Sequence, residues 1–326
     1  MNSSSSAFSV RTRIGRIGLT RNNRATSNKA ITTEARKTTT DEQSKKKKKR
    51  LTKAMASSSA AASELKPAII IGGGRVGKAL FDMGENKGDV VLRREDEFPK
   101  IPKEGPIFVC TRNAELEKVI EKTPGHRRKD LVFLQNGMLE TYLDSKGLAK
   151  NTQCLIYFAC AKLGEKPIDG ITTVNPEGLT ATTGVWAEEV AKRFHNGNLT
   201  CHVKDYDSYR ASMFEKLIWI SSFMLVGAQH PGATVGDVAK AHKNEVEALI
   251  VELVKGVSNV LNVTFEAGTL ERLLAYADSV AHFPTAVKEF EWRNGFFYSL
   301  SLKETQGSNE DPFPIHTQLL KNINLV

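Results

Sequence analysis

The stretch that most constrains the fold is residues 67–79, PAIIIGGGRVGKA, in which an apolar run passes directly into closely spaced glycines. A short, continuous apolar run is typical of a parallel strand that is buried on both faces. Gly72, Gly74 and Gly77 would allow a tight turn, a close backbone approach to a pyrophosphate and close packing of the following helix. The free amides that begin such a helix hold phosphates. The pattern therefore predicts a strand, a glycine loop and a helix that together bind a dinucleotide.

The end of the next expected strand, residues 89–92, indicates which dinucleotide binds. At this position, about 20 residues after the loop, a carboxylate selects the ribose 2′-hydroxyl of NAD and an arginine accepts the 2′-phosphate of NADP. Arg93 and Arg94 occupy it here, with Glu95 beside them. We therefore predict NADP(H), although two arginines after a strand also fit an ordinary solvated surface. The predicted cofactor contacts are Gly72, Gly73, Gly74, Arg75, Val76, Gly77, Arg93, Arg94, Thr111 and Asn136.

Further strands and short helices alternate along the first part of the chain. Ligands of a doubly wound parallel sheet lie beyond the carboxyl ends of its strands, which directs attention to Thr111 and Asn136. Because Asn136 precedes a glycine, it could equally be a turn residue that tolerates a positive φ. The expected strands are 68–71, 89–92, 105–111, 130–135, 154–161, 170–174 and 199–203, with helices at 114–122 and 186–195.

Beyond residue 205 the pattern changes to long, periodically apolar segments at 206–228, 235–261 and 270–281, which are typical of helices. The predicted fold class is therefore α/β, with a doubly wound, mostly parallel Rossmann sheet followed by an all-helical C-terminal domain. We expect a dinucleotide-binding domain at 66–204 and a helical domain at 205–326.

The positive charge of the chain is concentrated before this predicted body. Residues 1–54 contain seven arginines and eight lysines against three acids, so the remainder is mildly acidic and offers no basic groove for nucleic acid. We expect residues 1–65 to be a disordered basic targeting or linker segment. Its Ser- and Arg-rich beginning resembles a transit peptide and predicts the plastid stroma. Two alternatives remain, a nuclear-localisation-like run at 45–50 and a true start at Met55, which would leave the protein in the cytoplasm.

The cysteines and the apolar runs bear on metals and membranes. Four cysteines, Cys110, Cys154, Cys160 and Cys201, have no metal-ligand spacing, and we expect neither a disulfide nor a bound metal. The longest apolar run, residues 217–228, is shorter than the roughly 20 residues that cross a bilayer. We therefore predict no membrane partner, and the charge distribution predicts no nucleic-acid partner. A small-molecule substrate is what the family resemblance described next implies.

The order of motifs resembles the ketopantoate reductase family, whose helical C-terminal domain is similar to that of 6-phosphogluconate dehydrogenase. The resemblance spans roughly residues 67 to 322. It is based on the glycine loop, on LQNGM at 134–138, on EKL at 215–217, on EFEWRNG at 289–295 and on TQLL at 317–320.

This resemblance implies an NADP-dependent reduction of a 2-oxo acid, and it leaves open a homodimer. Lys216 matches the lysine that donates the proton to the carbonyl oxygen as hydride arrives, and a partly desolvated lysine has a lowered pKa that improves it as an acid. Glu289 matches the glutamate that binds the substrate or orients the lysine, and Asn136 matches the asparagine near the nicotinamide. Lys216 could instead be a surface lysine, and Glu289 could simply pair with Lys288 or Arg293.

The sequence also departs from the family pattern. Family members carry asparagines four and eight residues beyond the lysine, where this chain has Ile220 and Met224. Losing such donors leaves polar substrate atoms unpaired at about 1–3 kcal/mol each. We therefore predict a reductase of a small 2-oxo acid or related carbonyl, and keep as the alternative a catalytically decayed NADP-binding sensor or scaffold. An active site should open toward Lys216, whereas a decayed one should be closed by apolar side chains around Trp219, Ile220 and Met224.

Overall fold

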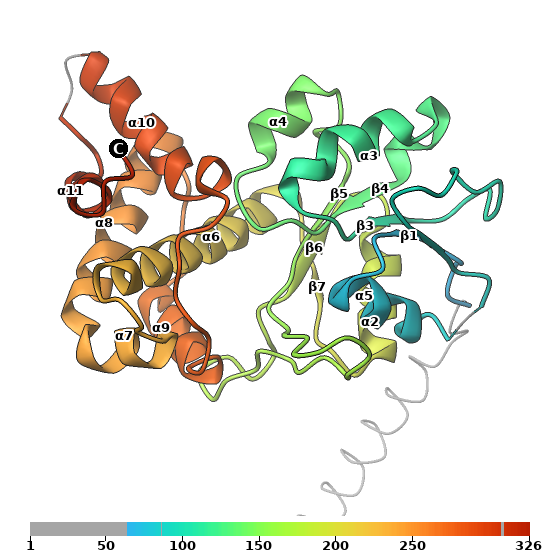
Figure 1. Cartoon of the computed structure of the whole chain (residues 1–326), viewed down its shortest axis with the longest axis horizontal. Coiled ribbons are helices and arrows are strands. Elements are labelled where there is room, and N and C mark those ends of the chain that lie inside the picture. Colours follow the sequence, from blue (N-terminus) through green and yellow to red (C-terminus); the bar gives the residue numbers. More distant parts are fainter. Residues whose placement is uncertain (1–63, 86, 308–309) are drawn as a thin grey trace, which may run out of the picture. The chain divides into compact units, whose positions relative to one another are not determined.

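The computed structural model describes residues 64–85, 87–307 and 310–326, and the chain from Glu64 to Val326 forms one compact unit (Figure 1). The expectations for the basic segment, the transit peptide and the alternative start at Met55 lie outside the described residues. Within them, the last strand ends at Val203 and the first long helix begins at Tyr206. The domain division at 204/205 stays a prediction.

A mixed sheet of seven strands forms the first part of the described chain, in the order β2-β1-β3-β4-β5-β6-β7. All neighbouring pairs are parallel except β5 and β6. The chain adds β2 on one side of β1 and then returns to add β3 on the other, so a crevice forms at the carboxyl end of β1. The strands are β1 (Ile69–Ile71), β2 (Val90–Leu92), β3 (Ile107–Val109), β4 (Leu131–Phe133), β5 (Thr152–Leu155), β6 (Ala181–Thr183) and β7 (His202–Val203).

Helices cover both faces of the sheet, because successive strand residues point to opposite sides. Ile70 packs with Leu80 and Phe194 beneath α2 and α5, whereas Ile69 packs with Leu116 and others beneath α3 and α4 (Figure 1). These helices are α2 (Arg75–Met83), α3 (Leu116–Lys122), α4 (Glu140–Ser145) and α5 (Ala187–Asn196), with short 3-10 turns η1 (Asn113–Glu115) and η2 (Gly125–Asp130).

A buried ion pair fixes the edge of the sheet that carries β2. The Arg193 and Asp89 side chains are each 1% exposed and lie 2.6 Å apart. Asp89 also accepts the backbone N–H of Ala68 at 2.7 Å, and Arg193 donates to the carbonyl of Leu80 at 2.9 Å. The pair thus joins α5, α2 and the beginnings of β1 and β2.

The second half of the chain is helical and is built around α6 (Tyr206–Gln229). Asp205 caps this helix by accepting the backbone N–H of Ser208. By length and composition α6 could cross a membrane, but 72% of its apolar window is buried within the described unit, as in a core helix. The other helices gather around it (Figure 1). They are α7 (Val235–Ala241), α8 (Lys243–Leu261), α9 (Thr269–Ser279), η3 (Phe290–Trp292), α10 (Asn294–Gln306) and α11 (Pro314–Asn322).

The predicted fold class is confirmed, but three predicted elements are wrong. Residues 170–174 are not a strand, because they form an exposed turn in which Thr172 Oγ1 accepts the backbone N–H of Asn175. The sheet is completed instead by β6, whose short ATT sequence carries no apolar alternation. The strand expected at 154–161 ends at Leu155. The helix expected at 235–261 is interrupted at His242, where the backbone leaves the helical conformation between α7 and α8.

Candidate functional site

The glycine loop joins β1 to α2 through contacts that admit no side chain at two positions. Gly72 has a φ of +105°, and a Cβ there would lie 2.8 Å from the carbonyl oxygen of Cys110. A Cβ on Gly77 would lie 1.9 Å from the carbonyl oxygen of Gly72. The tight turn and the close packing of helix on strand therefore both depend on glycine.

Gly74 differs, because the protein itself leaves room for a side chain there. A Cβ at this position would meet nothing within 4 Å, and its φ of −73° suits any residue. Gly74 is also the N-cap of α2, where no side chain caps the helix and no acid occupies the first turn. The free amides and the positive end of the helix dipole thus remain available to an anion that approaches the backbone closely.

The two residues that follow Gly74 are placed differently. The Arg75 guanidinium donates to the carbonyl oxygens of Cys160 and Ala161 at 3.0 and 3.1 Å, which directs its charge to the segment after β5. Val76 packs into the core on that face of the sheet. Arg75 and Val76 therefore contribute to the glycine loop through their backbone atoms and not through their side chains.

A cavity of about 560 Å³ lies beside the loop at the crevice of the sheet. Its volume is in the range of small-molecule sites. Cations dominate its polar lining: Arg93 and Arg94 from the end of β2 and Arg112 from the end of β3 are joined by Lys118 and Lys122 of α3, against the two acids Asp96 and Glu115. Gly72, Gly73 and Thr111 also line it. The cavity is therefore suited to a phosphorylated ligand.

The contacts within this cavity leave much of its positive charge accessible. Asp96 accepts the backbone N–H of Arg93 at 2.7 Å, so it orders the turn after β2. The Arg94 side chain is 77% exposed and reaches Glu115 at 3.4 Å. Lys118 and Lys122 were not among the predicted cofactor contacts, although their spacing of four residues on one helix could have indicated a shared face.

A second, much smaller cavity brings Asn136 and Lys216 together, as the resemblance implied. It measures about 20 Å³, roughly the space of one water molecule. Asn136 follows β4, and Lys216 and Ile220 come from α6. The remaining lining is mostly apolar, so the crevice at Lys216 is nearly closed in this structure.

Lys216 is 8% exposed and lies against aromatic rings. Its Nζ is 4.0 Å from the centre of the Tyr157 ring and 5.6 Å from that of Tyr276. Burial, and then the neighbouring Arg293 guanidinium, lower the pKa of Lys216 from 10.5 to about 7, while Cys154 acts weakly in the opposite direction. A lysine with this pKa exchanges a proton near neutrality, which suits a general acid. The two tyrosines were not predicted as neighbours of Lys216, because they lie about 60 residues away on either side.

Glu289 lies at the junction between the helices and the sheet. It has a φ of +49°, forms an ion pair with Arg293 and accepts the backbone N–H of Asn113 at 3.4 Å. Asn113 in turn donates from its side chain to the carbonyl oxygen of Asn136 at 3.1 Å. A hydrogen-bonded chain thus runs from Arg293 to the loop that carries Asn136, and the contacts of Glu289 are with Arg293 and Asn113.

The loop after β4 is also held against η3 by its backbone. The N–H of Met138 donates to the carbonyl oxygen of Trp292 at 2.7 Å. Gly137 has a φ of +124°, and a Cβ there would lie 2.6 Å from the same oxygen. The glycine after Asn136 therefore has a docking role that no turn requires.

The departures on α6 are hydrophobic in the structure as well. Ile220 lines the small cavity, and Met224 packs against the helical core. Ser221 and Ser222 are fully buried, and their hydroxyl oxygens lack a hydrogen-bond partner among the described residues. Ser279 donates to the carbonyl oxygen of Tyr276 at 2.7 Å.

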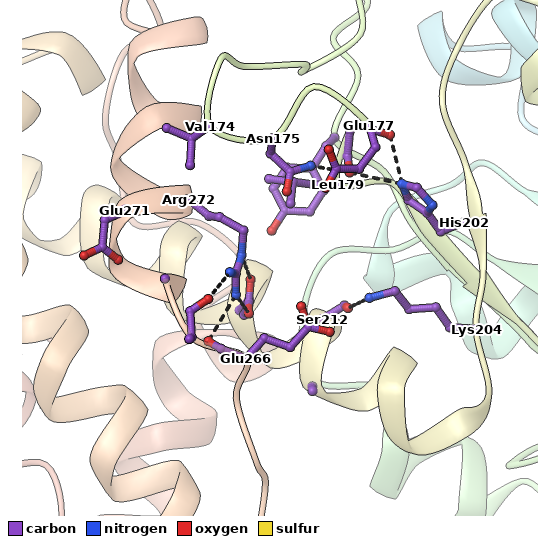
Figure 2. A pocket seen from close by; sticks show the side chains of 16 residues that line it. Val174, Asn175, Glu177, Leu179, His202, Lys204, Ser212, Glu266, Glu271 and Arg272 are labelled. Carbon is purple, nitrogen blue, oxygen red and sulfur yellow. Dashed lines mark hydrogen bonds and ion pairs between the residues drawn. The ribbon is translucent and has the colours of Figure 1, made fainter. Parts of the chain in front are cut away.

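A third cavity, of about 480 Å³, lies where α6 and the beginning of α9 approach β7 and the segment 174–179. Figure 2 shows its polar side chains largely paired with one another. Arg272 binds Glu215 at 2.5 Å, and Lys204 donates to Ser212 at 2.7 Å. Tyr157, whose ring contacts Lys216, also forms part of its wall. No pattern in the sequence indicated this cavity.

The sheet with its glycine loop, followed by the helices around α6, is a Rossmann sheet that precedes a helical region. No family model matches the sequence, and no curated protein is significantly similar to it.

Solved structures share this fold at low sequence identity. D-mandelate dehydrogenase in complex with NADH is 16% identical, with a TM-score of 0.56 over 79% of this chain and 98% of that chain. A PanE/ApbA family ketopantoate reductase from Ralstonia eutropha JMP134 is 14% identical, with a TM-score of 0.57 over 80% and 98%. A dimeric ketopantoate reductase from Staphylococcus aureus is 16% identical, with a TM-score of 0.54 over 79% and 99%. The predicted resemblance to ketopantoate reductases is thus confirmed for the fold.

Proposed function

We propose that this protein is an NADP-dependent oxidoreductase that reduces a small 2-oxo acid or related carbonyl compound, with Lys216 as the proton donor. The observation that carries the proposal is Lys216 itself, buried beside Asn136 at the edge of the sheet where the glycine loop lies, with a pKa near neutrality. The low-identity structures include one described with NADH and others described as ketopantoate reductases.

The dinucleotide would be held by residues at the carboxyl ends of three strands. The free amides after Gly74 would bind the pyrophosphate, and Arg93 and Arg94, which line the large cavity, would bind the 2′-phosphate. When bound, the cofactor supplies the hydride that is transferred to the carbonyl carbon. We infer NADP over NAD from the excess of cations that line this cavity, although one of the similar structures is described with NADH.

The chain's own residues would handle the charge that develops on the carbonyl oxygen. The Lys216 ammonium stabilises that oxygen and then transfers a proton to it, leaving a neutral amine. Asn136 offers its side-chain amide in the small cavity that Lys216 also lines. Glu289 holds the loop that carries Asn136 in place through Asn113. Because Ile220 replaces an amide donor, the substrate we propose has fewer polar groups than ketopantoate.

A second candidate, a catalytically decayed NADP-binding sensor, is favoured by one observation. The cavity at Lys216 measures about 20 Å³, which excludes any 2-oxo acid until α6 and the loop after β4 separate. The two candidates make the same prediction for cofactor binding and opposite predictions for turnover.

The test measures binding first and turnover second, on the full chain. NADPH and NADH are titrated by quenching of protein fluorescence, and NADPH oxidation is then followed against a panel of 2-oxo acids, aldehydes and ketones. We expect NADPH to bind more tightly than NADH. Arg93→Asp should lose this preference, whereas the control Lys100→Asp, at an exposed position, should keep it. Turnover that falls about 10²-fold or more in Lys216→Met supports the reductase. Tight NADPH binding without turnover supports the sensor, and no binding of either nucleotide refutes both.

Two further proposals concern the setting of the protein. We propose a plastid location from the Ser- and Arg-rich beginning of the chain, which a fluorescent fusion of residues 1–54 tests directly. We also propose a homodimer, since one of the similar structures is described as dimeric. Sedimentation of the full chain measures this, and a monomer at all concentrations would contradict it.

A further inference from the structure

A cluster of two histidines and one glutamate lies at the far end of α6 from the sheet, where three helices meet. His230 follows the last residue of α6, and His242 separates α7 from α8. Glu245 stands in the first turn of α8. The three side chains therefore come from separate helix ends, and their approach depends on the tertiary fold.

The ligand-type atoms of these residues converge. The Nε2 atom of His230 lies 3.1 and 3.0 Å from the two carboxylate oxygens of Glu245, and the Nδ1 atom of His242 lies 3.2 Å from one of them. One ligand atom from each residue lies within 4.8 Å of the others. The two imidazole rings stack with their centres 3.5 Å apart and their planes 11° from parallel.

These separations are close to those of a metal centre. Zinc binds nitrogen and carboxylate oxygen at about 2.0–2.2 Å in tetrahedral geometry, which places two ligand atoms about 3.3 Å apart. The nitrogen-to-oxygen distances in the cluster are 3.0 to 3.2 Å, so they need almost no change. The two nitrogens are at most 4.8 Å apart. The rings must tilt out of their stack to aim both lone pairs at one ion, and both side chains are partly exposed and free to do so.

We propose that His230, His242 and Glu245 form a binding site for a divalent transition-metal ion, with Zn²⁺ as the preferred occupant. Two imidazoles and one carboxylate suit zinc and its neighbours, whereas Mg²⁺ and Ca²⁺ require oxygen ligands. Three protein ligands leave one position for water. This proposal differs from the expectation of no bound metal, which was based on the spacing of the cysteines.

The charges around the cluster are compatible with a bound cation. Glu245 has a pKa held below its usual range, first by the hydrogen bond from His230 and also by that from His242, so it is ionised at neutral pH. Asp237 adds a second negative charge near His242, and Lys240 a positive charge near Asp237. Lys243 is directed to Glu247 at 3.5 Å. The ion would take the place of the hydrogen bonds that now join the two ring nitrogens to the Glu245 carboxylate.

An ion at this position would fasten the end of α6 to the beginning of α8. Because the folded chain alone brings the three ligands together, metal binding stabilises the folded state by mass action. At a free Zn²⁺ concentration of about 100 times Kd, the midpoint of thermal unfolding should rise by about 5 °C.

The test uses the full chain after treatment with a chelator. Isothermal titration with ZnCl₂ should give one ion per chain at this site, and MgCl₂ should give no heat and no competition. His230→Gln, His242→Gln and Glu245→Gln should each weaken Zn²⁺ binding more than about tenfold. The matched control is His126→Gln, which replaces an exposed histidine about 100 residues before the cluster. This variant should bind Zn²⁺ as the unaltered protein does. Circular dichroism reports whether each variant is folded.

The same titration at several pH values separates metal binding from simple sharing of protons. Affinity should fall as the pH is lowered, because protons compete with the ion for the same ligand atoms. Loss of Zn²⁺ binding in the three variants but not in the control supports the site. Absence of stoichiometric binding, or undiminished binding in His242→Gln, would overturn it.

Discussion

Replacing Lys216 with methionine should stabilise the protein while lowering turnover about 10²-fold or more. Methionine has nearly the volume of the lysine stem and carries no charge to bury. The free energy at stake follows from the pKa, which falls from 10.5 to about 7 on folding because the ammonium is buried near Arg293. Each pKa unit corresponds to about 1.4 kcal/mol, so the charged lysine costs the folded state up to about 5 kcal/mol.

Part of that gain is offset by lost attraction to the rings. The Lys216 ammonium lies 4.0 Å from the centre of the Tyr157 ring, and a desolvated contact of this kind contributes about 2 kcal/mol. The variant should therefore be more stable than the unaltered protein by about 3 kcal/mol at pH 6.

The sign of the pH dependence follows from which state binds more protons. Between about pH 7 and pH 10.5 the unfolded lysine is protonated and the folded one is not, so the stability of the unaltered protein rises with pH in that window. Below pH 7 both states are protonated and the full cost is present. The advantage of Lys216→Met should thus be constant below pH 7 and shrink by about 1.4 kcal/mol per pH unit above it.

Urea unfolding of both proteins at pH 6, 7, 8 and 9 measures this difference directly, because the contributions of all other groups cancel between them. The control is Lys255→Met, which removes an exposed lysine from α8 and should show no pH-dependent difference. If Lys216→Met were less stable at pH 6, or if its advantage did not vary with pH, the burial of a charged lysine at this position would be refuted.

Three further predictions concern the loop, the sheet edge and the small cavity. Gly77→Ala should unfold the protein or lower its free energy of unfolding by about 3 kcal/mol or more, since its Cβ would lie 1.9 Å from a carbonyl oxygen. Gly74→Ala should fold normally and lose NADPH binding. Arg193→Met should cost about 3–5 kcal/mol in urea unfolding because Asp89 would remain buried without its partner, and the loss should be smaller in the double variant with Asp89→Asn. Arg293→Met should raise the pKa of Lys216 and move the alkaline limb of the activity profile to higher pH, a shift that steady-state assays across pH would detect.

Local patterns in the sequence were sufficient to predict the glycine loop and most of the sheet. The apolar run before Gly72 indicates a buried strand directly. The close approach of Gly77 to Gly72 joins residues only five apart, so the glycine pattern also reveals it. β6 was missed because its three residues gain their strand conformation from pairing with β5 and β7, and not from a pattern of their own. Tertiary pairing overrides such weak local preference.

The chemical environment of the candidate site could not be predicted in the same way. Lys216 was placed by a motif, but the rings that face it come from Tyr157 and Tyr276, about 60 residues away on each side. The crevice at Lys216 is nearly closed because of the way the helices dock against the loop after β4, through the contact of Gly137 with Trp292. No short-range spacing encodes these distances.

The contrast between Lys216 and the other buried charges argues for a role beyond packing. Glu215, its neighbour on α6, is paired with Arg272, and Asp89 at the sheet edge is paired with Arg193. Buried charges with a structural role are thus compensated by an opposite charge in this chain, as the cost of desolvation requires. Lys216 has no carboxylate partner among the described residues and lies near a second cation. An ammonium kept in such a position destabilises the fold, and a transient negative charge on a substrate oxygen would supply the partner that the protein lacks.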